Sequence, residues 1–277
     1  MTRATLAEVL APALRDGHAV AGLVCQGWED ARAYVAAAEA EGAPVILQVG
    51  PGARAHMPLP VWAAMLGGLA DMAGVPVVLH LDHGTDAAEC RAAIDLGFTS
   101  VMFDGSALSL ADNIHRTGNV AAMARSAGVS CEGEIGFVGY ADGAASDGTD
   151  PDEAARFAAE TGVDAMAVSV GNMHLQRTQE GRIDRGRLDA IAARTRVPLV
   201  IHGGSGLSHD LRRDLARTSP VCKFNIGTEL RMHFGRALRC TLDDDPALFD
   251  RIAILSSIEP ALTEAARQVI AGLRAPA

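Results

Sequence analysis

Titratable side chains follow several of the apolar runs of this chain. The stretch "VVLHLDHGTD" holds His80, Asp82 and His83, and His174 and His202 follow later runs. Three histidines on separate strand ends suit a catalytic zinc ion, which takes three protein ligands and keeps one position open. The sequence therefore predicts a divalent metal site, with zinc as the first choice, at His83, His174 and His202. For His80, inside its apolar run, we expect a structural hydrogen bond.

Two carboxylates end predicted strands that lie between those of the histidines. Asp104 follows "TSVMF" and Glu134 lies in "CEGEIG". Their ordinary role is to orient the histidines through hydrogen bonds, and the alternative is to bind a second cation or the same metal in another position. Asp82, beside the predicted ligand His83, is placed to exchange a proton with a substrate oxygen.

Two glycine-containing loops indicate a phosphate site. "HGGSG" spans residues 202–206 and precedes a helix predicted to begin near Ser208, and "NIGTE" spans residues 225–229. Backbone N–H groups of such loops can converge on an anion. Either loop alone is more often a tight turn, but the two together predict a phosphate site.

The elements that position these residues alternate regularly along the chain. Short apolar runs with β-branched residues alternate with alanine-rich stretches of helical spacing. The runs are "HAVAGLVC", "APVILQVG", "VPVVLHLD", "FTSVMFDG", "GVSCEGEIG", "VDAMAVSVG", "VPLVIHGG" and "VCKFNIGT". Asp150 before Pro151 predicts a helix start, and Gly162 its end.

Eight such βα units without a linker predict an α/β fold, the (β/α)8 TIM barrel with extra C-terminal helices. We expect one domain over residues 1–277, with the barrel at about 18–240 and a C-terminal helical extension at about 241–277. Polar residues at strand ends then meet at one mouth, where active sites of this fold lie.

The composition limits the class of function. The formal net charge of −10 argues against nucleic acid or an anionic membrane surface as a partner. No apolar run approaches the roughly 18 residues of a membrane span, and the N-terminus lacks a signal-type segment. The five cysteines are scattered and show no CxxC spacing, which argues against a disulfide framework. We therefore expect a reduced, cytoplasmic protein.

Five motifs, in order, resemble those of the class II, metal-dependent ketose-bisphosphate aldolases, the fructose- and tagatose-bisphosphate aldolase family. They are "VPVVLHLDHG", "TSVMFDGS", "CEGEIG", "LVIHGGSG" and "CKFNIGTEL", and the similarity runs over about residues 18–240. The resemblance implies reversible cleavage of a ketose (bis)phosphate to dihydroxyacetone phosphate and an aldehyde through a metal-stabilised enediolate. It also implies a homodimer or homotetramer.

The resemblance implies roles for individual residues. The zinc, or another divalent metal, would lie on His83, His174 and His202, and the proton donor would be Asp82. Asp104 and Glu134 would form the second cation site. Dihydroxyacetone phosphate would be held by the two glycine loops, with room for a monovalent cation, through Gly203, Gly204, Ser205, Asn225, Ile226, Gly227 and Thr228. Lys223, the only lysine of the chain, would be a strand residue outside the reacting centre, so no Schiff base is expected.

The chain departs from the family pattern around the substrate. Asp142 stands where the family has a catalytic glutamate, and we expect it to take that role with a shorter side chain. Leu175 replaces a glycine that contacts phosphate or a monovalent cation, and Val24 and Gly50 replace polar contacts. Each lost hydrogen bond typically weakens recognition by about 0.5–1.5 kcal/mol. The sequence therefore predicts poor use of fructose 1,6-bisphosphate and better use of a smaller or less charged aldehyde.

Three alternatives stay open from the residues alone. The enzyme could use a different phosphorylated or carboxylated carbonyl donor in the same chemistry. The open metal position could instead activate water, which would make the protein a zinc hydrolase. A binding protein without catalysis is the third alternative. Release of dihydroxyacetone phosphate distinguishes the aldolase from all three.

Overall fold

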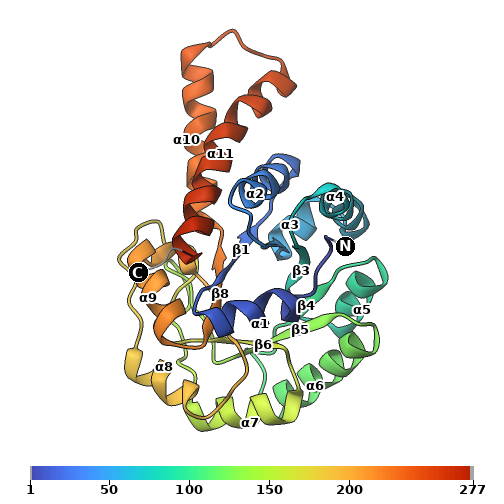
Figure 1. The fold of residues 1–277 in the computed structure, drawn as a ribbon, viewed down its shortest axis with the longest axis vertical. Helices are drawn as coiled ribbons and strands as arrows, with labels where there is room; N and C mark the ends of the chain where they lie inside the picture. The colour runs from blue at the N-terminus through green and yellow to red at the C-terminus, as the bar shows by residue number, and fades with distance from the viewer. Residues whose placement is uncertain (1, 275–277) are drawn as a thin grey trace.

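Eight parallel strands close into a barrel in the computed structural model, which describes residues 2–274 (Figure 1). The strands pair in sequence order, and β1 pairs with β8 to complete the ring. They are β1 (Val20–Val24), β2 (Val45–Val49), β3 (Val77–Gly84), β4 (Ser100–Phe103), β5 (Ser130–Ile135), β6 (Ala165–Val168), β7 (Leu199–Ile201) and β8 (Val221–Ile226). Each begins within a run predicted from the sequence, and only β3 extends past its run, by two residues to Gly84. The TIM-barrel prediction is confirmed.

The strands alternate with helices, most of which surround the barrel and cover the outer faces of the strands. They are α1 (Leu6–Asp16), α2 (Trp28–Ala40), α3 (Pro51–His56), α4 (Leu59–Met72), α5 (Ala87–Asp95), α6 (Leu110–Ser126), α7 (Pro151–Thr161), α8 (Arg185–Ala192), α9 (His209–Thr218), α10 (Thr228–Asp244) and α11 (Arg251–Arg274). The predicted cap of α7 is confirmed, because the Asp150 side chain accepts from two backbone N–H groups of the first turn and Gly162 ends the helix at φ 66°.

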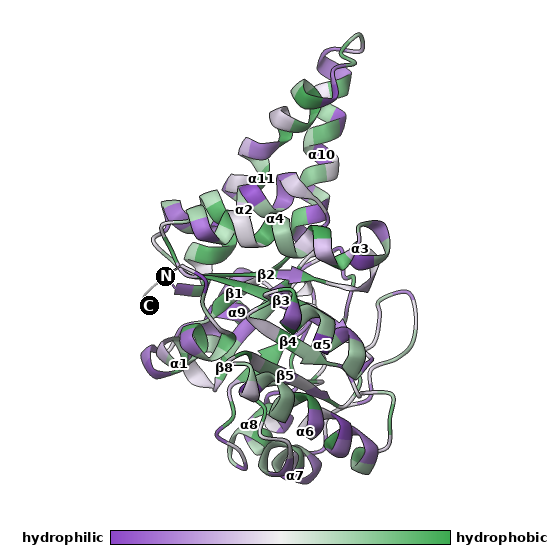
Figure 2. Cartoon of the chain, turned by 90° about the vertical axis from the view of Figure 1, so that its right-hand side faces the viewer, coloured by the Kyte–Doolittle hydropathy of each residue, from purple (hydrophilic) through white to green (hydrophobic). Residues whose placement is uncertain are grey.

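The N-terminal end of the barrel is filled by apolar side chains. Leu6 and Leu10 of α1 are fully buried and pack with inward-facing residues such as Val20, Ile46 and Val78. Figure 2 shows the apolar strands at the centre and hydrophilic residues on the outer sides of the helices. The buried polar side chains of the strands therefore lie above this plug, toward the opposite end.

Helices α10 and α11 form a pair that projects beyond the barrel (Figures 1 and 2). α10 begins directly after β8, and α11 returns to pack against α2 and α9. The predicted C-terminal helices are present, but the boundary expected near residue 240 falls inside α10. Residues 275–277 of the expected extension lie outside the described residues. Because α11 packs on the barrel helices, we infer one domain. Over residues 2–274, no helix has the length and apolarity needed to cross a membrane.

Candidate active site

Three histidines from different parts of the chain meet at the C-terminal end of the barrel. His83 lies in β3, His174 follows β6, and His202 directly follows β7. Their ring centroids are 4.8 to 5.6 Å apart. One ring nitrogen from each lies within 4.8 Å of the others. The structure thus brings together the three histidines predicted as metal ligands.

The backbone of β3 is irregular at His83. His83 has φ 51°, and the register of β3 against β4 shifts between Leu81 and Gly84. Such an irregularity breaks the alternation of side chains, so that both Asp82 and His83 line one pocket. Arg54 of α3 holds this backbone, because its guanidinium donates to the carbonyls of Asp82 at 2.6 Å and His83 at 3.1 Å. The sequence analysis missed Arg54, which no motif marks.

Asp104 and Glu134 lie beside His83. Asp104 Oδ2 is 2.7 Å and Glu134 Oε2 is 3.7 Å from His83 Nδ1. Burial disfavours the charged imidazole, but Asp82 and these two carboxylates raise the pKa of His83 to about 10. Burial, together with the charge of Asp104, raises the pKa of Glu134 to about 7. The three side chains form a second group of closely spaced ligand atoms, next to the three histidines.

Two buried polar atoms at this centre lack a hydrogen-bond partner within the described chain. They are His202 Nδ1 and Glu134 Oε2, which lie 3.6 Å apart. A buried polar atom without a partner costs free energy. Imidazole nitrogen and carboxylate oxygen are also the ligand atoms that zinc takes in proteins. The donor set therefore fits a divalent ion held by His83, His174 and His202, with Asp104 and Glu134 adjoining it.

A buried charged network lies beneath His202. Glu132 Oε1 accepts a hydrogen bond from His202 Nε2 at 3.1 Å, and Glu132 Oε2 pairs with Lys223 Nζ at 2.6 Å. This bond orients the ring so that Nδ1 is left for a metal. The expected structural role of His80 is confirmed, since its Nδ1 lies 2.8 Å from Ser100 Oγ and burial lowers its pKa to about 3. As expected, Lys223 does not line the pocket. It forms an ion pair with Glu132, which in turn accepts the hydrogen bond that orients the His202 ring.

The two predicted phosphate loops lie side by side at the mouth. The Ser205 hydroxyl accepts from the backbone N–H groups of Gly227 at 3.1 Å and Glu229 at 3.2 Å. Gly203 has φ 66°, and a Cβ there would lie 2.0 Å from a backbone oxygen, so this position requires glycine. The loop residues that line the pocket of the histidines are Gly203, Ser205, Asn225, Gly227 and Thr228. Of the other two predicted residues, Gly204 is buried and the Ile226 side chain belongs to the core.

Asp82 is buried in the wall of the same pocket. Asn225 Nδ2 lies 3.4 Å from Asp82 Oδ1, and Gly50 lies on the other side, where a Cβ would be 3.6 Å from Asp82 Oδ2. Burial opposes ionisation, but the positive charges of His83 and its neighbours outweigh it and lower the pKa of Asp82. The side chain is therefore a carboxylate able to accept a proton.

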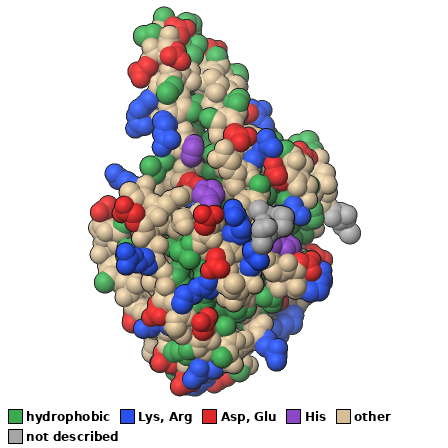
Figure 3. Space-filling view, turned by 60° about the vertical axis from the view of Figure 1, so that its left-hand side comes forward, with side chains coloured by type: hydrophobic (Ala, Val, Ile, Leu, Met, Phe, Trp, Pro, Cys, Tyr) green, Lys and Arg blue, Asp and Glu red, His purple; other side chains and the backbone are tan. Residues whose placement is uncertain are grey.

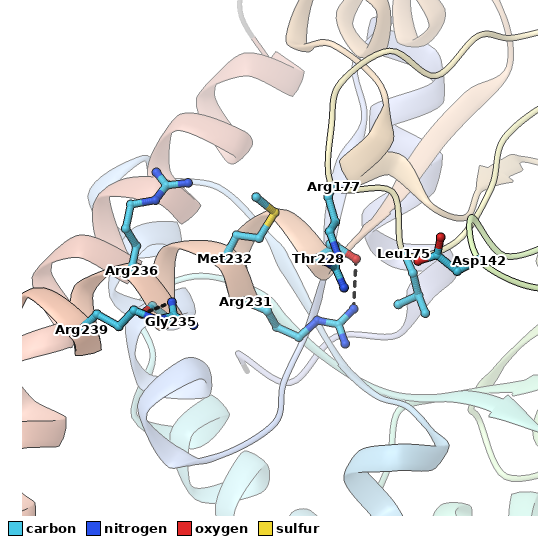
Figure 4. Close-up of a pocket in the computed structure, with 9 residues that line it drawn as sticks. All are labelled: Asp142, Leu175, Arg177, Thr228, Arg231, Met232, Gly235, Arg236 and Arg239. Atoms are coloured by element: carbon cyan, nitrogen blue, oxygen red, sulfur yellow. Dashed lines mark hydrogen bonds between the residues drawn. The ribbon is translucent and has the colours of Figure 1, made fainter.

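Asp142 is not brought to the histidines. It is exposed in the loop between β5 and α7 and lines a neighbouring cavity along α10 (Figure 4). Tyr140, from the same loop, instead stacks on His174 with ring centroids 5.0 Å apart, a contact that the sequence analysis missed. Leu175 borders both cavities and has φ 60°, a region in which side-chain-bearing residues are strained.

Comparison with known proteins agrees with this geometry. The family model of class II fructose-bisphosphate aldolase matches residues 4–275. The chain is 37% identical over 251 residues to 6-phospho-5-dehydro-2-deoxy-D-gluconate aldolase of Shouchella clausii, covering 88% of this chain and 85% of that protein. It is 36% identical over 258 residues to the fructose-bisphosphate aldolase of Geobacillus stearothermophilus, covering 90% and 89%.

Among solved structures, the YdjI aldolase from Escherichia coli K12 aligns with a TM-score of 0.87 at 27% identity, covering 98% of this chain and 97% of that one. The similarity thus extends over the barrel and the C-terminal helices, well beyond the short motifs. The chain therefore belongs to the class II fructose-bisphosphate aldolase family and is a lyase of the aldolase type.

Proposed function

We propose that the protein reversibly cleaves a ketose phosphate or bisphosphate to dihydroxyacetone phosphate and an aldehyde, with zinc or another divalent ion on His83, His174 and His202. One observation carries the proposal: His83, His174, Asp82 and residues of both phosphate loops line a single pocket of about 410 Å³, and the buried ring of His202 lies beside His83 with ring centroids 4.8 Å apart. When bound, the ion supplies Lewis-acid stabilisation of the negative charge that cleavage leaves on the three-carbon product.

The residues around the ion have the remaining roles of proton transfer, phosphate binding and ligand orientation. Asp82 accepts the proton of the substrate hydroxyl in cleavage and returns it in condensation. The loops at Gly203–Ser205 and Asn225–Thr228 hold the phosphate and so fix the reacting carbons. Asp104 and Glu134 orient His83 or hold a second cation, and a monovalent cation can accompany the phosphate. Asp142 serves as a second proton-transfer group only after its loop moves toward the pocket, a motion typical of active-site loops.

Membership of the family does not determine which aldehyde the enzyme releases. One relative is named for a phosphorylated deoxygluconate and another for fructose bisphosphate. Val24 and Gly50 line the pocket here and offer no polar side chain. These residues support our proposal that fructose 1,6-bisphosphate is a poor substrate. We further propose a homodimer or homotetramer, as the family resemblance implies, and a cytoplasmic location, which the scattered cysteines favour.

The phosphate loops favour an aldolase over a zinc hydrolase, because a hydrolase on this barrel needs water at the open position but no three-carbon phosphate site. Hydrolysis of a phosphate or amide substrate without any aldol product would support the hydrolase.

The test measures dihydroxyacetone phosphate release and metal content together. Wild-type protein should release this product from a panel of ketose phosphates, lose activity to a chelator and regain it with zinc. His202→Ala should lose both the metal and the activity. His115→Ala, on the outer face of α6, is the matched control and should keep both. Full metal occupancy in His202→Ala would contradict the assigned ligand.

A further inference from the structure

The ring of Tyr140 forms part of the reaction pocket. It stacks on His174 with ring centroids 5.0 Å apart and ring planes inclined by 28°, and it lines the same pocket as Asp82. Tyr140 is 43% exposed, so part of its side chain is free to contact a ligand. The ring is therefore an apolar surface beside a predicted metal ligand.

The backbone holds Tyr140 in this position. The His174 N–H donates to the Gly139 carbonyl at 2.8 Å, and the Ala141 N–H donates to the His174 carbonyl at 3.0 Å. These two bonds flank Tyr140, whose own N–H donates to the Ala144 carbonyl at 2.9 Å within a tight turn. A side chain that is ordered before a substrate binds loses little conformational entropy on contact, which suits it to discriminate between substrates.

The part of the pocket outside the phosphate loops is mainly apolar. With the donor phosphate in the loops after β7 and β8, the aldehyde half occupies this part. Its lining beside Tyr140 includes an uncharged amide, Gln26, and four apolar residues, which are Val24, Pro51, Ala53 and Leu175. A methyl group gains free energy by leaving water for such a lining, whereas a hydroxyl group loses hydrogen bonds with water there.

Arg54, beside this lining, is not free to bind an anion. Its guanidinium donates two hydrogen bonds to the Glu89 carboxylate and three to backbone carbonyls, at 2.6 to 3.1 Å. These five bonds use all the N–H donors of a guanidinium. The pocket wall near Arg54 therefore offers no cation to an anionic aldehyde.

Arg231 borders the pocket on the side of the phosphate loops. It lies in the first turn of α10, and its Nη2 donates to Thr228 Oγ1 at 3.1 Å. Figure 3 shows basic side chains on the projecting helices. The other arginines nearby line the neighbouring cavity and not this pocket, and they are Arg177, Arg236 and Arg239. The cations available to an anion thus lie toward α10, whereas the wall around Tyr140 presents apolar side chains.

We propose that Tyr140 determines which aldehyde the enzyme uses, and that the preferred aldehyde ends in an uncharged apolar carbon. The proposal rests on the proposed function, which places the donor phosphate in the two loops. A three-carbon aldehyde of this kind is 2-hydroxypropanal, whose methyl group packs against the Tyr140 ring. The corresponding substrate is a 6-deoxyketose 1-phosphate. Cleavage between its C3 and C4 gives dihydroxyacetone phosphate and 2-hydroxypropanal.

Three aldehydes that differ only in the substituent on C3 test the proposal. Zinc-loaded protein condenses each of them with dihydroxyacetone phosphate, and they are 2-hydroxypropanal, glyceraldehyde and glyceraldehyde 3-phosphate. The kcat/KM of wild type for 2-hydroxypropanal should exceed the other two values at least about tenfold, since an apolar pocket discriminates to this extent against an added polar group. A higher value for glyceraldehyde 3-phosphate would overturn the proposal and would indicate an anion site near Arg231.

Substitution of Tyr140 separates its effect on specificity from support of His174. At equal zinc content, Tyr140→Ala should lower kcat/KM about tenfold for 2-hydroxypropanal and less than about threefold for glyceraldehyde. Tyr140→Phe keeps the ring and should retain the wild-type preference. Equal losses for all three aldehydes in Tyr140→Ala would show that the ring only supports His174, and would overturn the proposal.

Trp28→Ala is the matched control. Trp28 is an aromatic residue of similar exposure, 40%, that lines other cavities and not the reaction pocket. Its removal should leave kcat/KM for all three aldehydes within about threefold of wild type. The same loss of preference in Trp28→Ala as in Tyr140→Ala would contradict a specific role of the Tyr140 ring.

Binding to metal-free protein provides a readout without turnover. Calorimetry compares 6-deoxyfructose 1-phosphate with fructose 1-phosphate, which differ only by the hydroxyl group on C6. The deoxy compound should bind wild type at least about threefold more tightly, and Tyr140→Ala about equally. Equal affinities in wild type would overturn the proposal. If wild-type protein forms no aldol product with any of the aldehydes and releases no dihydroxyacetone phosphate, the proposed function fails, and this inference with it. Efficient condensation with glyceraldehyde 3-phosphate in preference to 2-hydroxypropanal would refute this inference alone.

Discussion

The Lys223 ammonium lies 2.6 Å from the Glu132 carboxylate in the interior of the barrel, where both side chains are fully buried. Burial opposes the charge of Glu132, but Lys223 outweighs it and holds the pKa of Glu132 well below its usual range. The other oxygen of Glu132 accepts from His202. One ion pair thus compensates a buried charge and also orients a predicted metal ligand.

Lys223→Met should destabilise the zinc-loaded protein strongly. The substitution leaves the Glu132 charge buried without its partner, which typically costs about 3–5 kcal/mol. Urea unfolding measures the change. Arg156→Met breaks the exposed pair with Glu160 and should cost less than about 1 kcal/mol. Equal, small losses in the two variants would show that Glu132 is uncharged or otherwise compensated.

Asp82→Asn should lower kcat by about 10²-fold or more while metal binding is retained, because Asp82 exchanges the proton but does not hold the ion. Metal content and kcat are measured on the same samples. A variant with normal kcat would show that another group carries the proton.

Asp142→Asn should lower kcat at least about tenfold if the loop delivers Asp142 to the substrate, as we propose. Asp147→Asn, an exposed aspartate of the same loop, is the control and should leave kcat within about threefold. Equal rates for wild type and Asp142→Asn would remove Asp142 from the mechanism.

Leu175→Gly should raise kcat/KM on fructose 1,6-bisphosphate severalfold without loss of stability. The leucine at φ 60° costs about 1–2 kcal/mol of backbone strain, which offsets the greater chain entropy of glycine, and its side chain narrows the space between the two cavities. Leu175→Ala removes most of the side chain but keeps the strain. It should therefore improve kcat/KM less and lower the unfolding temperature. Identical kinetics in all three proteins would show that Leu175 does not obstruct the pocket.

Glu229→Gln should reduce stability near neutral pH but not in acid. Burial raises the pKa of Glu229, but its bonds to His209 and Arg212 outweigh this and hold it below 4.5. A lowered carboxyl pKa contributes stability that is present above the unfolded value and is lost as pH falls through the folded value. The difference from wild type should be about 1–3 kcal/mol at pH 7 and shrink progressively as the pH falls below 4.5, as followed by urea unfolding. Glu160→Gln, an exposed control, should show little difference at either pH.

The sequence by itself determined the barrel and most of the site. Eight apolar runs separated by helical spacing can bury their faces in few other ways, and the carboxyl ends of parallel strands must share one edge. That rule is enough to predict that His83, His174 and His202 lie close together, even when no distance is known. The glycine loops were recognisable for a similarly local reason, because a strand followed by glycines and a helix start exposes backbone N–H groups.

The tertiary structure alone decided which side chains touch across the barrel. Glu132 lies in β5, whereas His202 follows β7 and Lys223 lies in β8, so no spacing in the sequence reveals that they form one network. Arg231 sits one turn into a helix, where its partners depend on the neighbouring loops. Asp142 lies in the loop between β5 and α7, as predicted. The side chain of this loop that contacts His174 is Tyr140, however, and not Asp142. Local patterns fix where a residue lies along the chain, but contacts between distant segments depend on packing of the whole barrel.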